Sequence, residues 1–121
     1  MVSFMKQYEN QTYALLRIAS GFAFLSHGAQ KLMNFGELPA LMAYVAMPIE
    51  LVGGALIMLG LFTSPAAFLC SGMAAAAYWM GHFSAESYLP IMNRGDGAAL
   101  FAFVFLYISA KGTGIWGVGK D

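Results

Sequence analysis

Four long apolar stretches, separated by short polar or turn-forming segments, make up most of this chain of 121 residues. They cover about residues 13–33, 41–62, 66–83 and 97–115. A helix needs about 20 residues to cross the hydrocarbon core of a bilayer, and tilt or thinning tolerates a few fewer. Isolated strands cannot span lipid without an unpaired edge. The pattern therefore predicts an all-α fold, a membrane-spanning antiparallel four-helix bundle in one domain over residues 1–121, with breaks near Gly36, Ser64 and Gly95.

The composition supports lipid rather than water as the main solvent of these stretches. Hydrophobic residues make up 60% of the chain and charged residues 10%, whereas soluble domains carry about a quarter charged residues. The formal net charge is zero, which removes the basic surface that nucleic-acid binding requires. The single cysteine, Cys70, lies in an apolar stretch and is predicted to be a buried thiol.

The topology follows from the ends of the spans. The first apolar stretch follows a polar start and is too long for a signal peptide, so we expect it to stay as an anchor. Four spans place both termini on one side of the membrane. That side carries Lys6, Arg17, Lys111 and Lys120, against Lys31 and Arg94 on the other. The positive-inside rule thus places both termini in the cytoplasm.

A polar stripe runs along the first predicted helix. Its members are spaced 3, 4, 3 and 4 residues apart and share one helix face, an arc of roughly 80°; they are Arg17, Ser20, Phe24, His27 and Lys31. Charged groups that face lipid cost several kcal/mol, so the stripe should face other helices or the membrane interface. We likewise expect Gly53, Gly54 and Ala74 to face other helices, because small side chains let backbones approach closely.

Glu50 is the acidic residue that lies well inside the second apolar stretch. At 1.5 Å rise per residue, its height in the membrane is close to that of His27. A buried carboxylate must be neutral or paired, so we predict that Glu50 contacts His27 or Arg17 directly or through one water. The predicted polar cluster lies in the outer half of the membrane with Arg17 below it, and consists of Arg17, His27, Lys31, Glu50, His82, Asn93 and Asp96.

Two interpretations of this cluster stay open, a ligand-binding site and a structural set that fixes helix register. Arg17 and Lys31 are individually typical of snorkelling anchors, and Asp96 fits a helix N-cap as well as a functional acid. Catalytic residues stay unknown, because no phosphate loop, CxxC, nucleophile elbow or HExxH is present. No metal site is predicted: His27, Glu50, His82 and Asp96 have suitable ligand types for zinc but no spacing motif. Haem b between His27 and His82 is disfavoured on the same ground.

Several segments together resemble the DoxX family of small four-helix membrane proteins. They are LLRIASGFAFLSHGAQKL, PIELVGGALIMLGLFTSPAAF, MAAAAYWMGHF and NRGDGAALFAFVFLYISAKGTGIW, from about Leu15 to Trp116. The family pattern places an Arg at the start of the first helix and His-Gly-x-x-Lys at its end, here Arg17 and His27 to Lys31. It also brings Glu-x-x-Gly-Gly, here from Glu50, and Asn-x-Gly-Glu, in which Asp96 replaces the usual Glu.

The resemblance implies a prokaryotic cytoplasmic (inner) membrane location and an accessory subunit more readily than a self-sufficient enzyme. The family takes its name from a subunit of a thiosulfate:quinone oxidoreductase, other relatives are linked to oxidative-stress complexes, and distant ones act as membrane chaperones. The leading hypothesis is a redox-associated subunit that binds a quinone or supports a partner oxidoreductase. The alternative is a non-catalytic membrane assembly or chaperone module. Expected partners are the lipid bilayer, a redox protein and a second copy of the chain.

Overall fold

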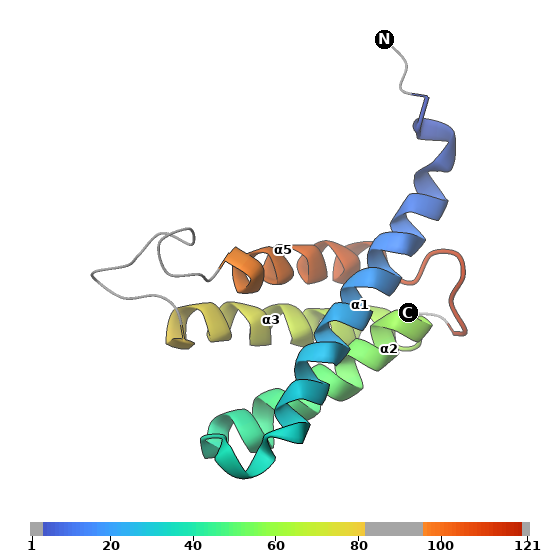
Figure 1. The fold of residues 1–121 in the computed structure, drawn as a ribbon. Helices are drawn as coiled ribbons and strands as arrows, with labels where there is room; N and C mark the ends of the chain where they lie inside the picture. Colours follow the sequence, from blue (N-terminus) through green and yellow to red (C-terminus); the bar gives the residue numbers. More distant parts are fainter. Residues whose placement is uncertain (1–3, 82–95, 120–121) are drawn as a thin grey trace.

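The computed structural model of the protein describes residues 4–81 and 96–119 (Figure 1). All regular structure in these two ranges is helical, which confirms the all-α prediction. Four long helical segments carry the fold, preceded by the short turn η1 (Lys6–Tyr8): α1 (Glu9–Met33), a second run over residues 40–59, α3 (Thr63–Gly81) and α5 (Asp96–Lys111). A 3₁₀ turn, η2 (Phe35–Glu37), joins α1 to the second run.

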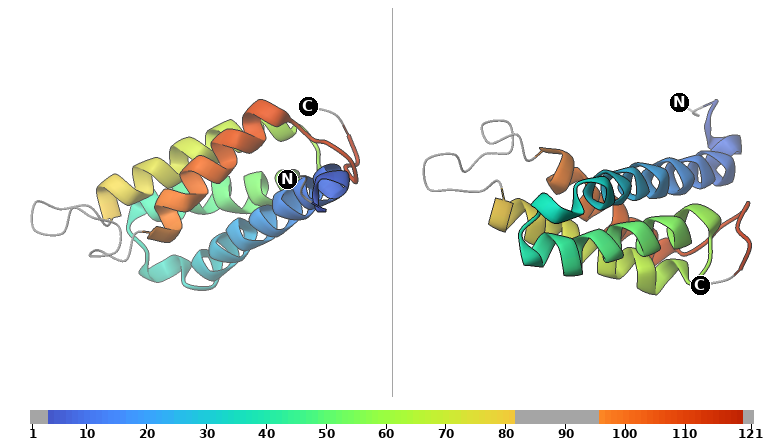
Figure 2. Two further views of the ribbon diagram at one scale, coloured as in Figure 1. Left: turned by 90° about the horizontal axis from the view of Figure 1, so that it is seen from above. Right: turned by 60° about the horizontal axis from the view of Figure 1, so that its bottom comes forward.

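The helices form two antiparallel pairs that pack on each other. Helix α1 lies against the second run, and α3 lies beside α5, as the views in Figures 1 and 2 agree. The turn between the second run and α3 and the loop after α5 lie at the same end of the bundle, near the first buried turns of α1 (Figure 2). This arrangement brings the start of α1 and the loop after α5 to one side of the fold.

The second run is an irregular helix built around a proline. It contains two π-helical segments, η3 (Met42–Ala46) and η4 (Ile49–Gly53), and ends in α2 (Gly54–Leu59). Pro48 lies between the two π-helical segments. A proline inside a helix lacks an N–H donor and its ring clashes with the carbonyl four residues earlier, so the helix must widen or bend there. The widening rotates the following side chains around the helix axis relative to a regular α-helix.

Two helices end earlier in the sequence than the apolar stretches predicted. The second helix ends at Leu59, not at residue 62, because Gly60 adopts the left-handed conformation (φ 75°) and donates its N–H to Leu56 O at 2.8 Å. The break lies at residues 60–62, close to the position predicted near Ser64, and Ser64 itself lies in the first turn of α3. The last helix ends at Lys111, and residues 112–119 form a loop where helix was predicted to Ile115. The predicted break at Gly95 lies outside the described residues.

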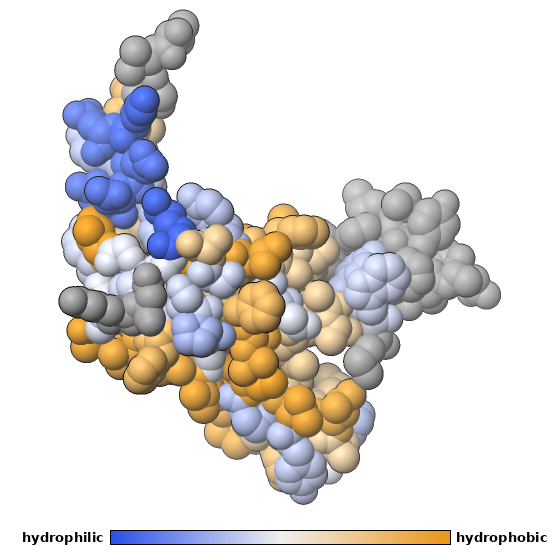
Figure 3. All heavy atoms as spheres, turned by 180° about the vertical axis from the view of Figure 1, so that it is seen from behind, coloured by the Kyte–Doolittle hydropathy of each residue, from blue (hydrophilic) through white to orange (hydrophobic). Residues whose placement is uncertain are grey.

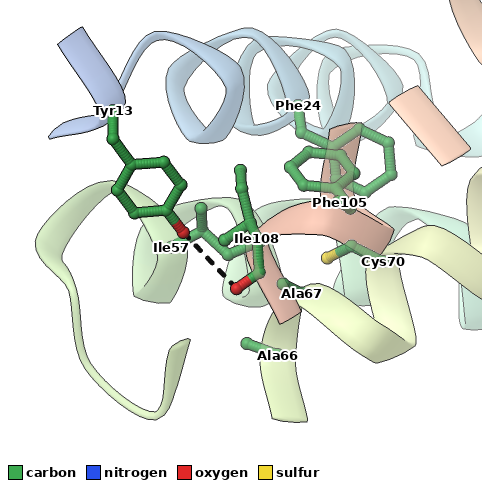
Figure 4. Close-up of a cluster of buried hydrophobic side chains, with 8 residues drawn as sticks. All are labelled: Tyr13, Phe24, Ile57, Ala66, Ala67, Cys70, Phe105 and Ile108. Carbon is green, nitrogen blue, oxygen red and sulfur yellow. Dashed lines mark hydrogen bonds between the residues drawn. The ribbon is translucent and has the colours of Figure 1, made fainter. Parts of the chain in front are cut away.

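The core lies where α1, α2, α3 and α5 meet (Figure 4). Its buried members are Tyr13, Phe24, Ile57, Ala66, Ala67, Cys70, Phe105 and Ile108. The rings of Phe24 and Phe105 pack edge to face, with centroids 4.9 Å apart. Cys70 is a buried free thiol, as predicted. These contacts tie the first helix to the last.

Glycines allow α1 and α2 to approach closely. A Cβ atom on Gly54 would lie 2.6 Å from Leu25 N and 2.8 Å from Gly21 O, so a side chain at this position would force the two helices apart. A Cβ atom on Gly53 would collide with the sulfur of Cys70 on α3, and Ala74 is 2% exposed. The prediction that Gly53, Gly54 and Ala74 face other helices is confirmed.

Large apolar side chains also cover the outside of the bundle (Figure 3). Each long helical segment carries at least one that is mostly exposed, among them Phe22, Val52, Phe68 and Phe103. Among the described helices, the segment Met42–Leu59 is both long and apolar enough to cross a membrane, and the apolar segment Gly97–Lys111 is shorter. Proteins that are surrounded only by water rarely expose so many large apolar side chains.

Candidate functional site

An ion pair joins the end of α1 to the second helical run. The Lys31 ammonium donates to both carboxylate oxygens of Glu50, at 2.9 Å to Oε1 and 3.0 Å to Oε2. The Glu50 side chain is 6% exposed and the Lys31 side chain 19%. Because burial removes water from both groups, each depends on the other for compensation of its charge.

Local sequence explains why these two side chains meet. Glu50 lies in the π-helical segment that follows Pro48, so the change of helical phase sets the direction of its side chain. Gly28 lies directly opposite on α1: a Cβ atom there would lie 2.8 Å from Leu51 N and 3.0 Å from Glu50 Cβ. The missing side chain lets the carboxylate reach α1, three residues before Lys31.

The ion pair borders a cavity of about 250 Å³ between α1, η4, α3 and α5. The cavity is lined by Phe24, His27, Lys31, Glu50, Met73, Ala74, Ala77, Gly97, Ala98 and Phe101. His27 is exposed, and its ring meets that of Phe101 edge to face with centroids 5.9 Å apart. Polar groups thus gather on the side formed by α1 and η4, while the rest of the wall is aliphatic or aromatic. This combination is typical of small-molecule sites.

The donors and acceptors in the cavity define what it can bind. Lys31 supplies only N–H donors, Glu50 supplies acceptors, and the His27 ring supplies one of each when neutral. A ligand with polar oxygen atoms on a flat apolar ring can therefore meet the polar side with its oxygens and the Phe101 side with its ring. The volume lies just below the range of about 300–1,000 Å³ typical of drug-sized ligands, so a single-ring group fits better than a large molecule.

Arg17 lies in a different environment, at the opposite end of the bundle, about two turns after the start of α1. Its side chain is fully buried, and it donates only to backbone carbonyls: from Nε to Ile57 O at 3.0 Å, from Nη1 to Thr113 O and to Ile115 O at 2.9 Å, and from Nη2 to Trp116 O at 2.7 Å. The guanidinium therefore holds the end of α2 and the loop after α5 against α1. We call this set of contacts the Arg17 node.

Neighbouring polar contacts close the same end. The Tyr13 hydroxyl donates to Gly112 O at 2.6 Å, and the Thr113 hydroxyl donates to the Thr63 hydroxyl at 2.8 Å. Within the described residues, every buried side-chain nitrogen or oxygen has a hydrogen-bond partner. The Arg17 node is thus a hydrogen-bonded structural closure of this end of the bundle.

The predicted polar cluster is therefore divided. The prediction was that Glu50 contacts His27 or Arg17, directly or through one water. The hydrogen bonds of Arg17 go instead to backbone carbonyls at the other end of the bundle. Lys31, expected to be an anchor, takes the direct contact predicted for His27 or Arg17. His27 instead shares the cavity with the ion pair. His82 and Asn93 lie outside the described residues, and so does the side chain of Asp96.

Sequence reasoning missed the apolar half of the cavity. Met73, Ala77 and Ala98 carry no signal of chemistry, and Phe101 belongs to an aromatic run that is equally typical of lipid-facing helices. In the part of the chain that the structure describes, no group of three or more His, Cys, Asp or Glu side chains is arranged to hold a metal ion. The haem pair needs His82 and lies outside that part.

The chain is similar to two known proteins and matches the model of one protein family. The chain is 36% identical to an uncharacterized protein of Haemophilus influenzae over 120 residues, which covers 91% of this chain and 90% of the relative. It is 43% identical over 58 residues to the putative oxidoreductase CatD of Bacillus subtilis, covering 40% of this chain and 43% of that protein. No solved structure matches the chain significantly. The model of the DoxX family matches residues 12–83, a range that contains Arg17, Lys31 and Glu50, and the chain therefore belongs to DoxX, a family of small membrane proteins.

Proposed function

We propose that this DoxX protein is a redox-associated subunit of the prokaryotic cytoplasmic membrane that binds a quinone headgroup in the Lys31–Glu50 cavity. The observation that carries the proposal is the placement of an ion pair and a histidine on one side of an otherwise apolar and aromatic cavity. The partial match to a protein named a putative oxidoreductase supports the redox assignment. In this proposal a partner oxidoreductase exchanges electrons with the bound quinone.

The membrane part of the proposal rests on lengths and surfaces. Helix α1 has 25 residues and α3 has 19, which correspond to about 37 Å and about 28 Å at 1.5 Å per residue. The hydrocarbon core is about 30 Å thick. Together with the exposed apolar side chains on all four helical segments, these lengths favour a four-helix bundle that spans the bilayer. The Arg17 end would face the cytoplasm, since Lys6 and Lys111 lie at that end.

The quinone part rests on matching chemistry. A quinone presents two carbonyl oxygens, which accept hydrogen bonds from Lys31 and from His27 in its donating tautomer. Its ring is flat and apolar and suits a wall that contains Phe24, Phe101 and Met73. An isoprenoid tail would leave the cavity toward the lipid. Glu50 holds the Lys31 ammonium in place, so the donor is already oriented when the headgroup enters.

The alternative function, an assembly or chaperone module, relied on small-residue faces that could hold client helices. The described structure uses these residues within the chain: Gly54 packs on α1, Gly53 on Cys70, and Ala77 lines the cavity. This use leaves fewer small-residue surfaces for a client and favours the ligand-binding proposal.

The experiment is a measurement of bound quinone. We expect the protein, purified in mild detergent, to release about one quinone per chain on solvent extraction and mass spectrometry. The double change Lys31→Met with Glu50→Leu removes the polar side of the cavity without leaving a lone charge, so its quinone content should fall at least tenfold. Phe103→Leu on the exposed face of α5 is the matched control and should keep it. Wild-type protein without quinone that co-purifies with other membrane proteins would instead support the assembly module.

A further inference from the structure

Two non-glycine residues in the described ranges have positive backbone φ angles, and both are aromatic. Phe62 has φ 48° and Trp116 has φ 61°. The left-handed region is unfavourable for residues with a bulky side chain. Neither residue gains burial in return, because Phe62 is 64% exposed and Trp116 is 57% exposed. The fold therefore holds two large rings outward in a conformation that the backbone disfavours.

The two residues lie on loops that are bonded to each other at the Arg17 end of the bundle. Val118 N donates to Leu59 O at 2.8 Å, and Gly119 N donates to Gly60 O at 3.0 Å. The carbonyl of Trp116 accepts a hydrogen bond from Arg17 at 2.7 Å. Figure 2 shows this loop and the turn after α2 side by side. Hydrogen bonds of the backbone, rather than packing of the rings, fix both aromatic residues.

The surroundings of the two rings match the boundary between lipid headgroups and acyl chains. Ile115 is 37% exposed and Val118 is 74% exposed on the same loop. Lys111, at the end of α5, is exposed and places its ammonium 5.2 Å from the centre of the Tyr13 ring. Tryptophan is enriched at membrane interfaces, and lysine extends its charge toward the headgroups from there. Apolar, aromatic and basic groups thus occur together at one helix end.

We propose that Phe62 and Trp116 form an aromatic anchor that inserts at the headgroup–acyl boundary of the bilayer and fixes the depth of the Arg17 end. The occupant of this surface is the lipid interface itself. An anchoring role gives a reason for the fold to keep two exposed aromatic rings at positions with a disfavoured backbone conformation. The anchor is independent of the cavity and of quinone binding.

Fluorescence quenching by lipids tests the depth of Trp116 directly. The chain has two tryptophans, so Trp79→Phe leaves Trp116 as the single emitter. We expect that, in phosphatidylcholine vesicles, lipids brominated near the glycerol end of the acyl chain quench this emission more than lipids brominated near the methyl end. Strong quenching by acrylamide without quenching by brominated lipid would place the ring in water and overturn the proposal. Resistance to both quenchers would mean that protein covers the ring and would overturn it as well.

A second experiment removes the rings without disturbing the backbone. Asparagine tolerates the left-handed conformation, so Phe62→Asn with Trp116→Asn should leave the melting temperature in detergent unchanged or higher. In vesicles, a cysteine introduced by Val118→Cys should then react several-fold faster with a water-soluble maleimide than in the parent protein. The protein without Val118→Cys, whose Cys70 is buried, gives the background. Phe35→Asn at the other end of the bundle is the matched control and should leave the rate unchanged. Equal rates with and without the two rings would refute the anchor.

Discussion

Two cations on the same helix, Arg17 and Lys31, differ in how far they are buried and in the groups that bind them. Arg17 is fully buried and held by four backbone carbonyls from α2 and the loop after α5. Lys31, 14 positions later and about 21 Å along the helix, is partly exposed and held by one carboxylate beside a cavity. Carbonyls that belong to folded backbone cannot leave their donor without unfolding the loop. A carboxylate and an ammonium on side chains can separate and exchange partners.

The difference assigns a role to each cation. The planar guanidinium directs several donors into one fixed arrangement, which suits a permanent closure of the bundle. The ammonium of Lys31 is a compact charge on a flexible chain, and its exposed fraction of 19% leaves it access to the cavity. The Arg17 node therefore stabilises the fold, whereas under the proposed function the Lys31–Glu50 pair orients the ammonium toward a ligand. Substitutions at the two ends should separate these roles.

The largest effect is expected for Arg17→Met. Four carbonyls at the closed end lose their donor, and the loop after α5 loses its attachment, so the free energy of unfolding should fall by about 3–5 kcal/mol. Thermal unfolding in detergent measures the loss. The stability of Arg17→Lys should lie between those of the wild type and Arg17→Met, because an ammonium cannot reproduce the several fixed donors of the guanidinium. A melting temperature for Arg17→Met equal to that of Lys31→Met would contradict the assignment of roles.

Gly60→Ala should damage the same end through the backbone. A Cβ atom at Gly60 would lie 2.6 Å from Gly117 Cα, at a φ of 75° that alanine disfavours. We expect a loss of about 2–4 kcal/mol, seen as a lower melting temperature with quinone content unchanged per folded molecule. Gly36→Ala is the control, because a Cβ atom there meets nothing within 4 Å. Equal tolerance of the two changes would argue against a tightly closed end.

Glu50→Leu should have a smaller effect on stability and a large one on binding. It leaves the Lys31 charge without its carboxylate, but the ammonium can reach water, so we expect a loss of about 1–3 kcal/mol. Glu50→Gln should be tolerated better, because the amide oxygen still accepts from Lys31. Adding Lys31→Met to Glu50→Leu should restore part of the stability without restoring quinone binding. A double-mutant cycle with no coupling energy would show that the pair does not form.

The smallest effect is expected for Thr63→Val. It removes the hydroxyl that accepts from Thr113 at 2.8 Å while keeping the buried volume, so the loss should be about 1 kcal/mol. Ser109→Ala on α5, whose hydroxyl bonds only its own helix at Leu106 O, serves as the comparison and should change the melting temperature less. A larger loss of stability for Ser109→Ala than for Thr63→Val would mean that hydrogen bonds between segments do not determine the stability of this end of the bundle.

The sequence predicts the helices well but not the partners of their polar residues. The apolar stretches and the spacing of Gly53, Gly54 and Ala74 carry a direct signal of helix packing, and the structure agrees. The partners of Arg17 carry no such signal, since they are main-chain carbonyls that any residue could supply. The loop that supplies three of them was itself predicted to be helical up to Ile115.

The error at Glu50 has a different cause. Its predicted partner was chosen by height, counted at a uniform rise along ideal helices. The π-helical segments around Pro48 break that uniformity, and a lysine side chain spans more than one helical turn, so Lys31 reaches a carboxylate that height alone assigned to His27. Counting residues therefore predicted correctly that Glu50 meets the polar stripe of the first helix. It could not predict which donor on that stripe Glu50 contacts.

The Arg17 node also has a consequence for the order in which the chain is assembled. Three of the four carbonyls that hold Arg17 lie 96, 98 and 99 positions after it in the sequence. During synthesis, the first helix is therefore made before these groups exist, and of the four carbonyls only that of Ile57, 40 positions later, can reach the arginine before the loop after α5 is made. The loop after α5 thus completes the hydrogen bonds of Arg17 on the first helix, and a chain that stops at Lys111 should remain a substrate for quality control.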